Sequence, residues 1–276
     1  MYLDLANQKA AKLNAMDEAK AYFDEAMVLL DALPETEENR QRRISLLVNQ
    51  GIVIMLLFKS SEYYKLLTRY EPMARDLGNP ELLGAFYARL GHCEFSFGNY
   101  DQGIQTLTKA AELAEESGNV EEAGYAYVWW QFSHLDRGDY ERVLALKEEF
   151  LRTVKQGFNY RWHTYTLSVA SRAFSYLGRW DEAVEEGKKV IELMQEFGLK
   201  QGRNGLEIFT MIEIPSNVIL ADEFATIFDG FSIGSNDLTQ YTMAAGRENP
   251  LVAEYFIDDH PAVLRLIELV VKESGD

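Results

Sequence analysis

The sequence predicts an α-helical solenoid followed by a shorter α/β segment. Two observations support the solenoid: a glycine–aromatic–acid corner recurs at Gly98, Gly138 and Gly178, 40 residues apart each time, and a second glycine series lies between these corners. A third observation supports the α/β segment: after about residue 199 the pattern changes to short apolar runs of strand length. We therefore expect a repeat domain over residues 1–198 and a second domain over residues 199–276.

Each glycine of the second series follows an amphipathic run, as in LAEESG. This is the position just after a helix end, where glycine adopts the left-handed conformation at little cost. Each period therefore holds two helices, and a fixed period of roughly 20 to 50 residues built from helix pairs is typical of a solenoid. The series consists of Gly78, Gly118, Gly157 and Gly198.

Weaker copies of the corner occur earlier, at residues 16–19 (MDEA) and 61–64 (SEYY). Together they indicate about five helix pairs, of which the first is incomplete. Met1 falls almost directly on a helix, whereas terminal repeats normally carry a polar cap. We therefore expect the chain to begin inside a longer array.

The last corner continues as GRWDEAVEEGKKVIEL, which resembles tetratricopeptide repeats, with Ala183, Gly187 and Val190 at the close-packing positions. The 40-residue period exceeds the usual length of about 34 residues. It resembles the long-helix variants found in bacterial signalling ATPases, cyclases and transcriptional activators. The resemblance implies that the repeats bind a protein or a peptide.

The aromatic side chains of the repeats permit two interpretations. They can line a concave peptide groove, or they can pack between helices, and packing is the more frequent role of such residues. We expect packing. The residues concerned are Tyr125, Tyr127, Trp129, Trp130, Trp162 and Trp180.

The histidines His92, His134 and His163 show no metal-ligand spacing, and we expect them to be structural. The single cysteine, Cys93, excludes an internal disulfide and is consistent with a reducing compartment. No run of 18 apolar residues and no signal-peptide pattern is present. These features predict a soluble, cytoplasmic protein without a membrane partner.

The net charge of −17 disfavours nucleic acid as a partner, because such a surface repels polyanions. The acidic excess is densest in the second domain, where residues 199–276 hold five Lys and Arg against thirteen Asp and Glu. A multiply anionic ligand would need a divalent cation to bind there.

The second domain begins with a β-type apolar run over residues 206–215. Ser216 is a suitable N-cap for a helix over residues 217–228, and a second strand follows over residues 230–233. A short helix over residues 238–245 and an amphipathic helix after Pro261 complete the segment. This order suits βα units of a parallel barrel, of which the segment is an incomplete part.

Two carboxylates follow these strands: Glu213 lies at the end of the first strand and Asp237 just past the second. Barrel enzymes place their chemistry at the C-terminal ends of the strands. A pair of carboxylates there forms a site for a hard cation, Mg²⁺ or Mn²⁺. The alternative is that both are solvated loop acids.

The runs MIEIPSNVILADEFA and DGFSIGSNDLTQ resemble the phosphoenolpyruvate (PEP)-utilising enzymes, PEP synthase above all, and QYTMAAGREN resembles enzyme I of the sugar phosphotransferase system. The resemblance implies part of a TIM-type (β/α)8 barrel. It assigns Glu213 and Asp237 as Mg²⁺ ligands, and Asn236 and Arg247 as contacts of the PEP phosphate. Gly246 stands where the family has an acidic residue.

The resemblance therefore implies a PEP-binding fragment or fusion of a phosphotransferase on a tetratricopeptide-like scaffold. We expect it to be catalytically incomplete alone, because the family's nucleotide-binding part, phosphorylatable histidine and terminal cysteine have no counterpart here. Two alternatives stay open. The chain can be a scaffold for protein partners with a structural remnant attached, or part of a signalling ATPase or cyclase.

Overall fold

The computed structural model describes residues 2–57, 59–153, 159–246 and 249–273. The chain divides into two compact units, Met1–Leu193 and Met194–Asp276. The first is entirely helical in its described part, whereas the second combines short helices with two strands. In the described residues, no helix has both the length and the hydropathy needed to cross a membrane.

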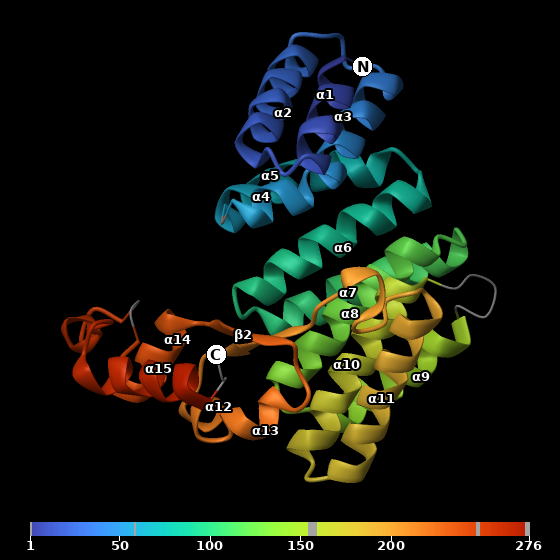
Figure 1. Cartoon of the computed structure of the whole chain (residues 1–276). Coiled ribbons are helices and arrows are strands. Elements are labelled where there is room, and N and C mark those ends of the chain that lie inside the picture. Colours follow the sequence, from blue (N-terminus) through green and yellow to red (C-terminus); the bar gives the residue numbers. More distant parts are fainter. Residues whose placement is uncertain (1, 58, 154–158, 247–248, 274–276) are drawn as a thin grey trace. The chain divides into compact units, whose positions relative to one another are not determined.

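The first unit is an array of helix pairs stacked along the chain (Figure 1). The last helix extends three residues into the second unit. The helices are α1 (Tyr2–Lys12), α2 (Met16–Asp31), α3 (Glu37–Asn49), α4 (Gly51–Leu56), α5 (Ser60–Asp76), α6 (Pro80–Ser96), α7 (Tyr100–Glu116), α8 (Val120–Asp136), α9 (Tyr140–Thr153), α10 (Tyr160–Tyr176) and α11 (Trp180–Glu196).

The predicted glycine corners are left-handed turns between helices. Gly98, Gly138 and Gly178 have φ of 73°, 79° and 71°. After Gly98, the N–H of Asn99 donates to the carbonyl of Glu94 at 2.9 Å, which closes the end of α6. The described glycines of the second series also have positive φ, and Gly157 lies outside the described residues. The 40-residue glycine pattern therefore marks real helix ends.

Most of the repeat aromatics pack between helices, as predicted. Tyr127, Trp130 and Trp162 are buried, and Tyr125 and Trp129 pack against the same core. Trp180 is the exception, because 65% of it is exposed. The prediction was wrong at this position because α11 is the last helix of the array, so no further helix of the array covers its first turn.

The close-packing positions predicted on α11 are only partly close-packed. Ala183 is buried, and Ser171 of α10 donates a hydrogen bond to its carbonyl at 2.8 Å. Val190 is half-buried, and a side chain added at Gly187 would meet no atom within 4 Å. Gly187 therefore does not serve close packing within this chain, contrary to the prediction.

The second unit contains a two-stranded parallel sheet, β1 (Phe209–Ile212) and β2 (Gly230–Ile233), paired with Ile212 opposite Ile233. The connection between the strands runs through two short helices. The hydrophobic core of the second unit contains Ile212, Val218, Leu238 and Val270. The remaining elements are η2 (Arg203–Gly205), α12 (Pro215–Ile219), α13 (Ala221–Ala225), α14 (Ser235–Met243), η3 (Ala253–Tyr255) and α15 (Pro261–Glu273).

The described part of the second unit holds one β–α–β unit and no further strand, so its origin as an incomplete part of a barrel stays a prediction. Local boundaries differ as well. The expected helix over residues 217–228 is two helices interrupted at Leu220. It begins at Pro215, whose fixed φ suits the first helical position, so Ser216 lies inside the helix and is not its cap.

Candidate functional site

The ends of β1 and β2 define the candidate site. The parallel register is continuous over all four residue pairs, so both strands end at the same edge of the sheet. The N–H of Gly234, directly after β2, donates to the carbonyl of Ile212 at 2.9 Å. The residues that follow the two strands are therefore held side by side.

Gly234 fixes how closely the two strand ends approach each other. A Cβ at this position would lie 2.8 Å from the Cβ of Glu213 and 3.2 Å from the Sδ of Met211. The clash is with the first atom of the Glu213 side chain, which moves only with its backbone. A glycine at this position thus lets the turn into α14 lie directly against Glu213.

The predicted site residues fall on this edge. Glu213 follows β1 directly and is half-buried, whereas Asn236 and Asp237 are exposed. Asp237 lies in the first turn of α14 and not in a loop, because that helix begins at Ser235, three residues before the predicted start. The structure therefore brings Glu213, Asn236 and Asp237 to neighbouring turns. Arg247 lies outside the described residues.

The donor set suits a cation that is shared with a substrate. Mg²⁺ is usually bound by one or two carboxylates together with water and substrate oxygens, and Glu213 and Asp237 supply two carboxylates. In the described ranges, no group of three or more His, Cys, Asp or Glu side chains is arranged to hold a metal ion. Two carboxylates alone do not make a closed metal cage, and the binding of Mg²⁺ by Glu213 and Asp237 stays a prediction.

The start of α14 adds a favourable field for an anion. Gly234 occupies the N-cap and offers no side chain, so no side-chain cap accepts from the first amide groups. The N-terminus of a helix carries partial positive charge and binds phosphate groups. Sequence reasoning missed Gly234, although a glycine directly after an apolar strand signals a close approach of backbone.

The histidines belong to structural contacts in the repeats. His92 stacks on Trp129, and its Nδ1 lies 2.6 Å from the hydroxyl of Tyr125. The guanidinium of Arg89 lies over the Tyr125 ring and forms an ion pair with Glu122. Burial and the neighbouring Arg89 lower the pKa of His92 to about 3. His92 is therefore neutral at physiological pH and occupies a packed aromatic layer.

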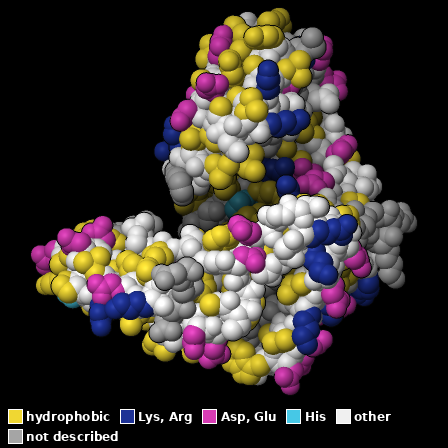
Figure 2. All heavy atoms as spheres, in the orientation of Figure 1, with side chains coloured by type: hydrophobic (Ala, Val, Ile, Leu, Met, Phe, Trp, Pro, Cys, Tyr) yellow, Lys and Arg dark blue, Asp and Glu magenta, His cyan; other side chains and the backbone are white. Residues whose placement is uncertain are grey.

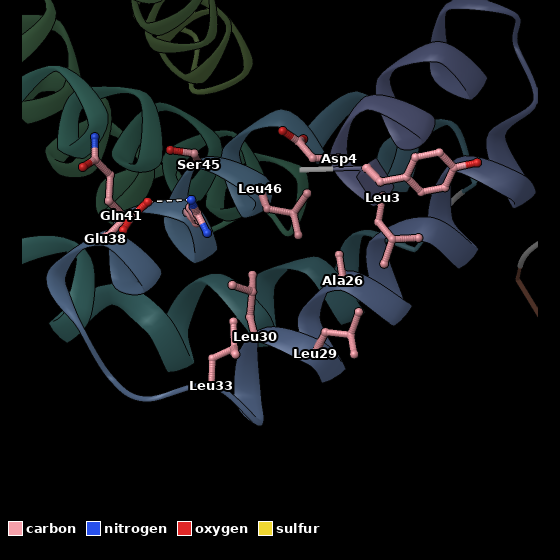
Figure 3. A pocket seen from close by; sticks show the side chains of 12 residues that line it. Leu3, Asp4, Ala26, Leu29, Leu30, Leu33, Glu38, Gln41, Ser45 and Leu46 are labelled. Atoms are coloured by element: carbon pink, nitrogen blue, oxygen red, sulfur yellow. Dashed lines mark hydrogen bonds and ion pairs between the residues drawn. The ribbon is translucent and has the colours of Figure 1, made fainter.

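A second candidate site is a groove in the N-terminal repeats. Its volume is about 610 Å³, and it lies between α1, α2 and α3. Figure 3 shows Leu3, Leu30 and Leu46 around this space, with Asp4 and Glu38 among the polar residues at its margin. Exposed apolar side chains also gather over these helices in Figure 2. No sequence pattern indicated the groove, because it depends on how three helices pack.

Comparison with known proteins shows which family the second unit resembles. Residues 177–276 match the model of the PEP-utilising enzyme, PEP-binding domain. Phosphoenolpyruvate synthase of Aquifex aeolicus is 54% identical over 92 residues, and that of Synechocystis sp. is 56% identical over 90 residues. Each match covers 33% of this chain, and the chain spans 11% of the length of either relative.

Solved structures resemble the helical array at low sequence identity, which shows the fold alone. The apo form of RapI has a TM-score of 0.60 at 11% identity, over 98% of this chain and 84% of that chain. A structure of nearly identical TPR-like repeats from Podosopora anserina has a TM-score of 0.57 at 11% identity, over 72% of this chain and 96% of that chain. The repeat array is thus a TPR-like solenoid.

The family model begins at residue 177, before α11, so this helix is the last of the repeat array and also part of the family match. The predicted resemblance to the PEP-utilising enzymes is confirmed from residue 177 onward, and the predicted repeat fold is confirmed before it. The chain joins a tetratricopeptide-like helical array to a segment homologous to the PEP-binding domain of the PEP-utilising enzymes.

Proposed function

We propose that the second unit binds phosphoenolpyruvate together with Mg²⁺, at the edge where β1 and β2 end. Glu213 and Asp237 would hold the cation, which Mn²⁺ can replace because it prefers the same oxygen donors. Asn236 and Arg247 would contact the phosphate, as in the related enzymes. The chain is then a fragment or fusion of a PEP synthase-like phosphotransferase on a repeat scaffold.

The observation that carries this proposal is the fit of Gly234 against Glu213. It holds the turn into α14 beside the end of β1, which places Glu213 and Asp237 on neighbouring turns. A two-carboxylate set is incomplete for Mg²⁺ without substrate oxygens. The arrangement therefore supports joint binding of the metal and the ligand.

The second unit needs the cation because of its charge. Residues 199–276 carry five basic and thirteen acidic side chains, which oppose the approach of a multiply anionic molecule. A bound divalent cation supplies positive charge at the phosphate and carboxylate of the ligand. Asn236 and the first turn of α14 then orient the phosphate by hydrogen bonds.

We propose that the chain alone does not convert pyruvate and ATP into PEP. Phosphoryl transfer depends on positioned positive charge around the phosphate, and Arg247 is the only arginine here that matches the family pattern. The domain boundary near residue 198 and the barrel character of the tail belong to the same proposal. A cytoplasmic location fits the single cysteine.

Calorimetry on the full chain tests the proposal. PEP is titrated with and without Mg²⁺ into the wild type and into Asp237→Asn and Glu213→Gln, which keep the side-chain size but remove the charge. Asp222→Asn, an exposed acid on α13, is the matched control. We expect weak PEP binding that requires Mg²⁺, is lost in both site variants and persists in the control.

Two outcomes would contradict the proposal. Micromolar PEP binding without metal would show that the cation is unnecessary. Equal loss of binding in Asp222→Asn would show a general charge effect and no site. ATP-dependent consumption of pyruvate by the purified chain would overturn the expectation of catalytic incompleteness.

The groove between α1, α2 and α3 favours a second function, the binding of a protein partner by the repeats. A groove of about 610 Å³ lined by leucines suits the apolar face of an amphipathic helix. Asp4 at the margin would face a basic residue on that helix, whereas Glu38 is already paired with Arg42 of the same groove. This function is compatible with PEP binding, because the groove lies wholly within the first unit.

A binding assay with designed peptides tests this second function. The probe is a labelled amphipathic helix with leucines at i, i+3 and i+7 and lysines beside them. We expect Leu29→Glu and Leu33→Glu, two exposed groove residues, to abolish binding, and Val184→Glu on α11 to leave it unchanged. Equal binding by all four proteins would exclude the groove.

A further inference from the structure

The last helix of the repeat array presents an apolar face that no other helix of the array covers. Trp180, Val184, Gly187 and Ile191 of α11 are spaced by four, three and four residues, which places them on one side of the helix. Trp180, Val184 and Ile191 are 65%, 56% and 56% exposed. Nothing lies within 4 Å of the position that a Gly187 side chain would occupy.

The repeat period shows that this face is normally covered. The equivalent positions lie 80 and 40 residues earlier, on α7 and α9. None of the eight equivalent side chains is exposed, and Leu107 and Ala111 of α7 are buried. The eight are Tyr100, Ile104, Leu107 and Ala111 on α7 and Tyr140, Leu144, Lys147 and Leu151 on α9. On α9, Leu144 packs against a buried cluster that includes Val169 and Ala173 of α10. Of these three helices, α11 alone has exposed side chains on this face.

Residues of the next repeat also contact the equivalent side chains on α7 and α9 directly. Tyr140, the equivalent of Trp180 on α9, stacks on Tyr176 of the next repeat with ring centroids 5.2 Å apart. Asp101, the equivalent of Asp181 on α7, pairs with Arg137 at 2.7 Å. A helix that covers α11 should therefore bring an apolar side chain to Trp180 and a cation to Asp181.

We propose that α11 of a second copy of this chain covers the face, in an antiparallel pair with two-fold symmetry. In one register, Trp180 meets Ile191 of the second copy and Val184 meets its Gly187, where the missing side chain leaves room. The same contacts recur by symmetry, as an isologous interface requires. In knobs-into-holes packing a side chain of one helix inserts between four residues of the other, and Gly187 would form part of such a hole for Val184.

Charge complementarity selects the same register. Asp181 and Lys188 lie on one flank of the face, seven residues apart. The antiparallel pairing brings Asp181 of each copy beside Lys188 of the other, which then exchanges its exposed partner Glu185, at 2.7 Å, for Asp181. Lys188 thereby takes the role that Arg137 has toward Asp101 within the array. In a parallel pair this flank of one helix lies across the seam from the same flank of the other, so Asp181 and Lys188 would not meet.

The mass of the full chain in solution tests this proposal. Light scattering after size-exclusion chromatography, over a dilution series, should give twice the 31.6 kDa chain mass at high concentration. Val184→Glu and Ile191→Glu should each weaken dimerisation by at least roughly tenfold, because they place a charge in the seam. Val28→Glu, at an exposed valine of α2, should leave the dimer unchanged.

Charge reversal tests the register. Asp181→Lys should weaken the dimer, and adding Lys188→Asp to the same chain should restore it, since the pair is then reversed. For orientation, a mixture of Trp180→Cys and Ile191→Cys chains should cross-link, whereas the Trp180→Cys chain alone should not. Cross-linking of Trp180→Cys with itself would indicate a parallel pair and contradict the proposal.

A chain that stays monomeric over the whole dilution series would overturn the proposal. So would a dimer whose mass is unchanged by Val184→Glu, because its interface would lie elsewhere. Failure of Lys188→Asp to rescue Asp181→Lys would exclude the proposed register. Circular dichroism of each variant, which should match the wild type, separates loss of the dimer from loss of folding.

Discussion

Gly234 and Gly98 show two separate requirements for glycine in one chain. Gly98 has φ of 73°, a left-handed conformation that other residues adopt only under strain. Gly234 has φ of −83°, which any residue can adopt, but it lies against Glu213. The first glycine is needed for its backbone angle and the second for its lack of a side chain.

Replacing Gly234 by alanine should therefore damage both the fold of the second unit and its site. The new Cβ would lie 2.8 Å from the Cβ of Glu213, so the strand ends must separate. Overpacking of this kind costs about 1–3 kcal/mol of unfolding free energy. Urea unfolding measures the loss. Ser235→Ala, a neighbouring exposed position, is the control and should change stability by less.

His92 should make the repeat array sensitive to acid. Its folded pKa of about 3 lies below the ordinary value of 6.5, because it is buried and beside Arg89. Between these two pH values the unfolded chain binds the proton and the folded chain does not. Stability is therefore lost as pH falls below about 6.5, by up to about 1.4 kcal/mol per pH unit from this one group.

Urea unfolding at a series of pH values tests this dependence. In His92→Gln the slope of unfolding free energy against pH should fall by the contribution of one proton, although the variant is less stable overall. His134 and His163 are also buried with lowered pKa, so part of the slope should remain. An unchanged slope in His92→Gln would exclude the assignment.

At the scale of single elements, α11 is held by a buried ion pair. Lys147 of α9 lies 3.0 Å from Glu186, and the two side chains are 9% and 6% exposed. Lys189 also contacts Glu186, at 2.9 Å. Burial lowers the pKa of Lys147, but its hydrogen bonds to Glu186 and Glu148 more than offset this, so the net shift is upward. The pair therefore stays charged.

Removing one partner of this pair should be costly, whereas removing both should not. Lys147→Met leaves a buried carboxylate with one exposed partner, and such losses cost about 3–5 kcal/mol. Lys147→Met with Glu186→Met should recover most of that stability. Arg42→Met, which breaks an exposed pair with Glu38, is the control and should cost no more than about 1 kcal/mol. Thermal unfolding of the four proteins compares them.

The elements differ in how far they could be predicted. The later repeat helices were predictable because α5 to α8, α10 and α11 are each followed by a glycine in the left-handed conformation, which leaves a 40-residue pattern. The break at Leu220 was not, since neither glycine nor proline marks it. Exposure of Trp180 was not predictable either, because a covering helix is a property of the neighbouring element.

The candidate site, too, could be predicted from the sequence only in part. Glu213 and Asp237 could be placed at strand ends from the alternation of apolar runs and turns. Their closeness depends on the parallel register and on the contact at Gly234, which only the fold provides. The groove between α1, α2 and α3 has no local signature, because its lining comes from three separate helices.

At the scale of the whole molecule, the repeat array should fold without the second unit. Solenoid repeats contact mainly their neighbours, and the array forms its own compact unit. Residues 1–198, expressed alone, should give a helical circular dichroism spectrum and a cooperative thermal transition. A disordered spectrum would contradict the independence of the array. The full chain, measured in parallel, is the reference.

The two-stranded sheet has a consequence for solubility. In the described residues each strand has one edge without a partner, and Phe209 and Met211 are half-exposed or more on β1. Open strand edges with apolar side chains are templates for aggregation. The acidic excess of residues 199–276 opposes such stacking, because like-charged copies repel one another. The same charge that hinders an anionic ligand therefore protects the exposed edges, and high salt should promote aggregation by screening it.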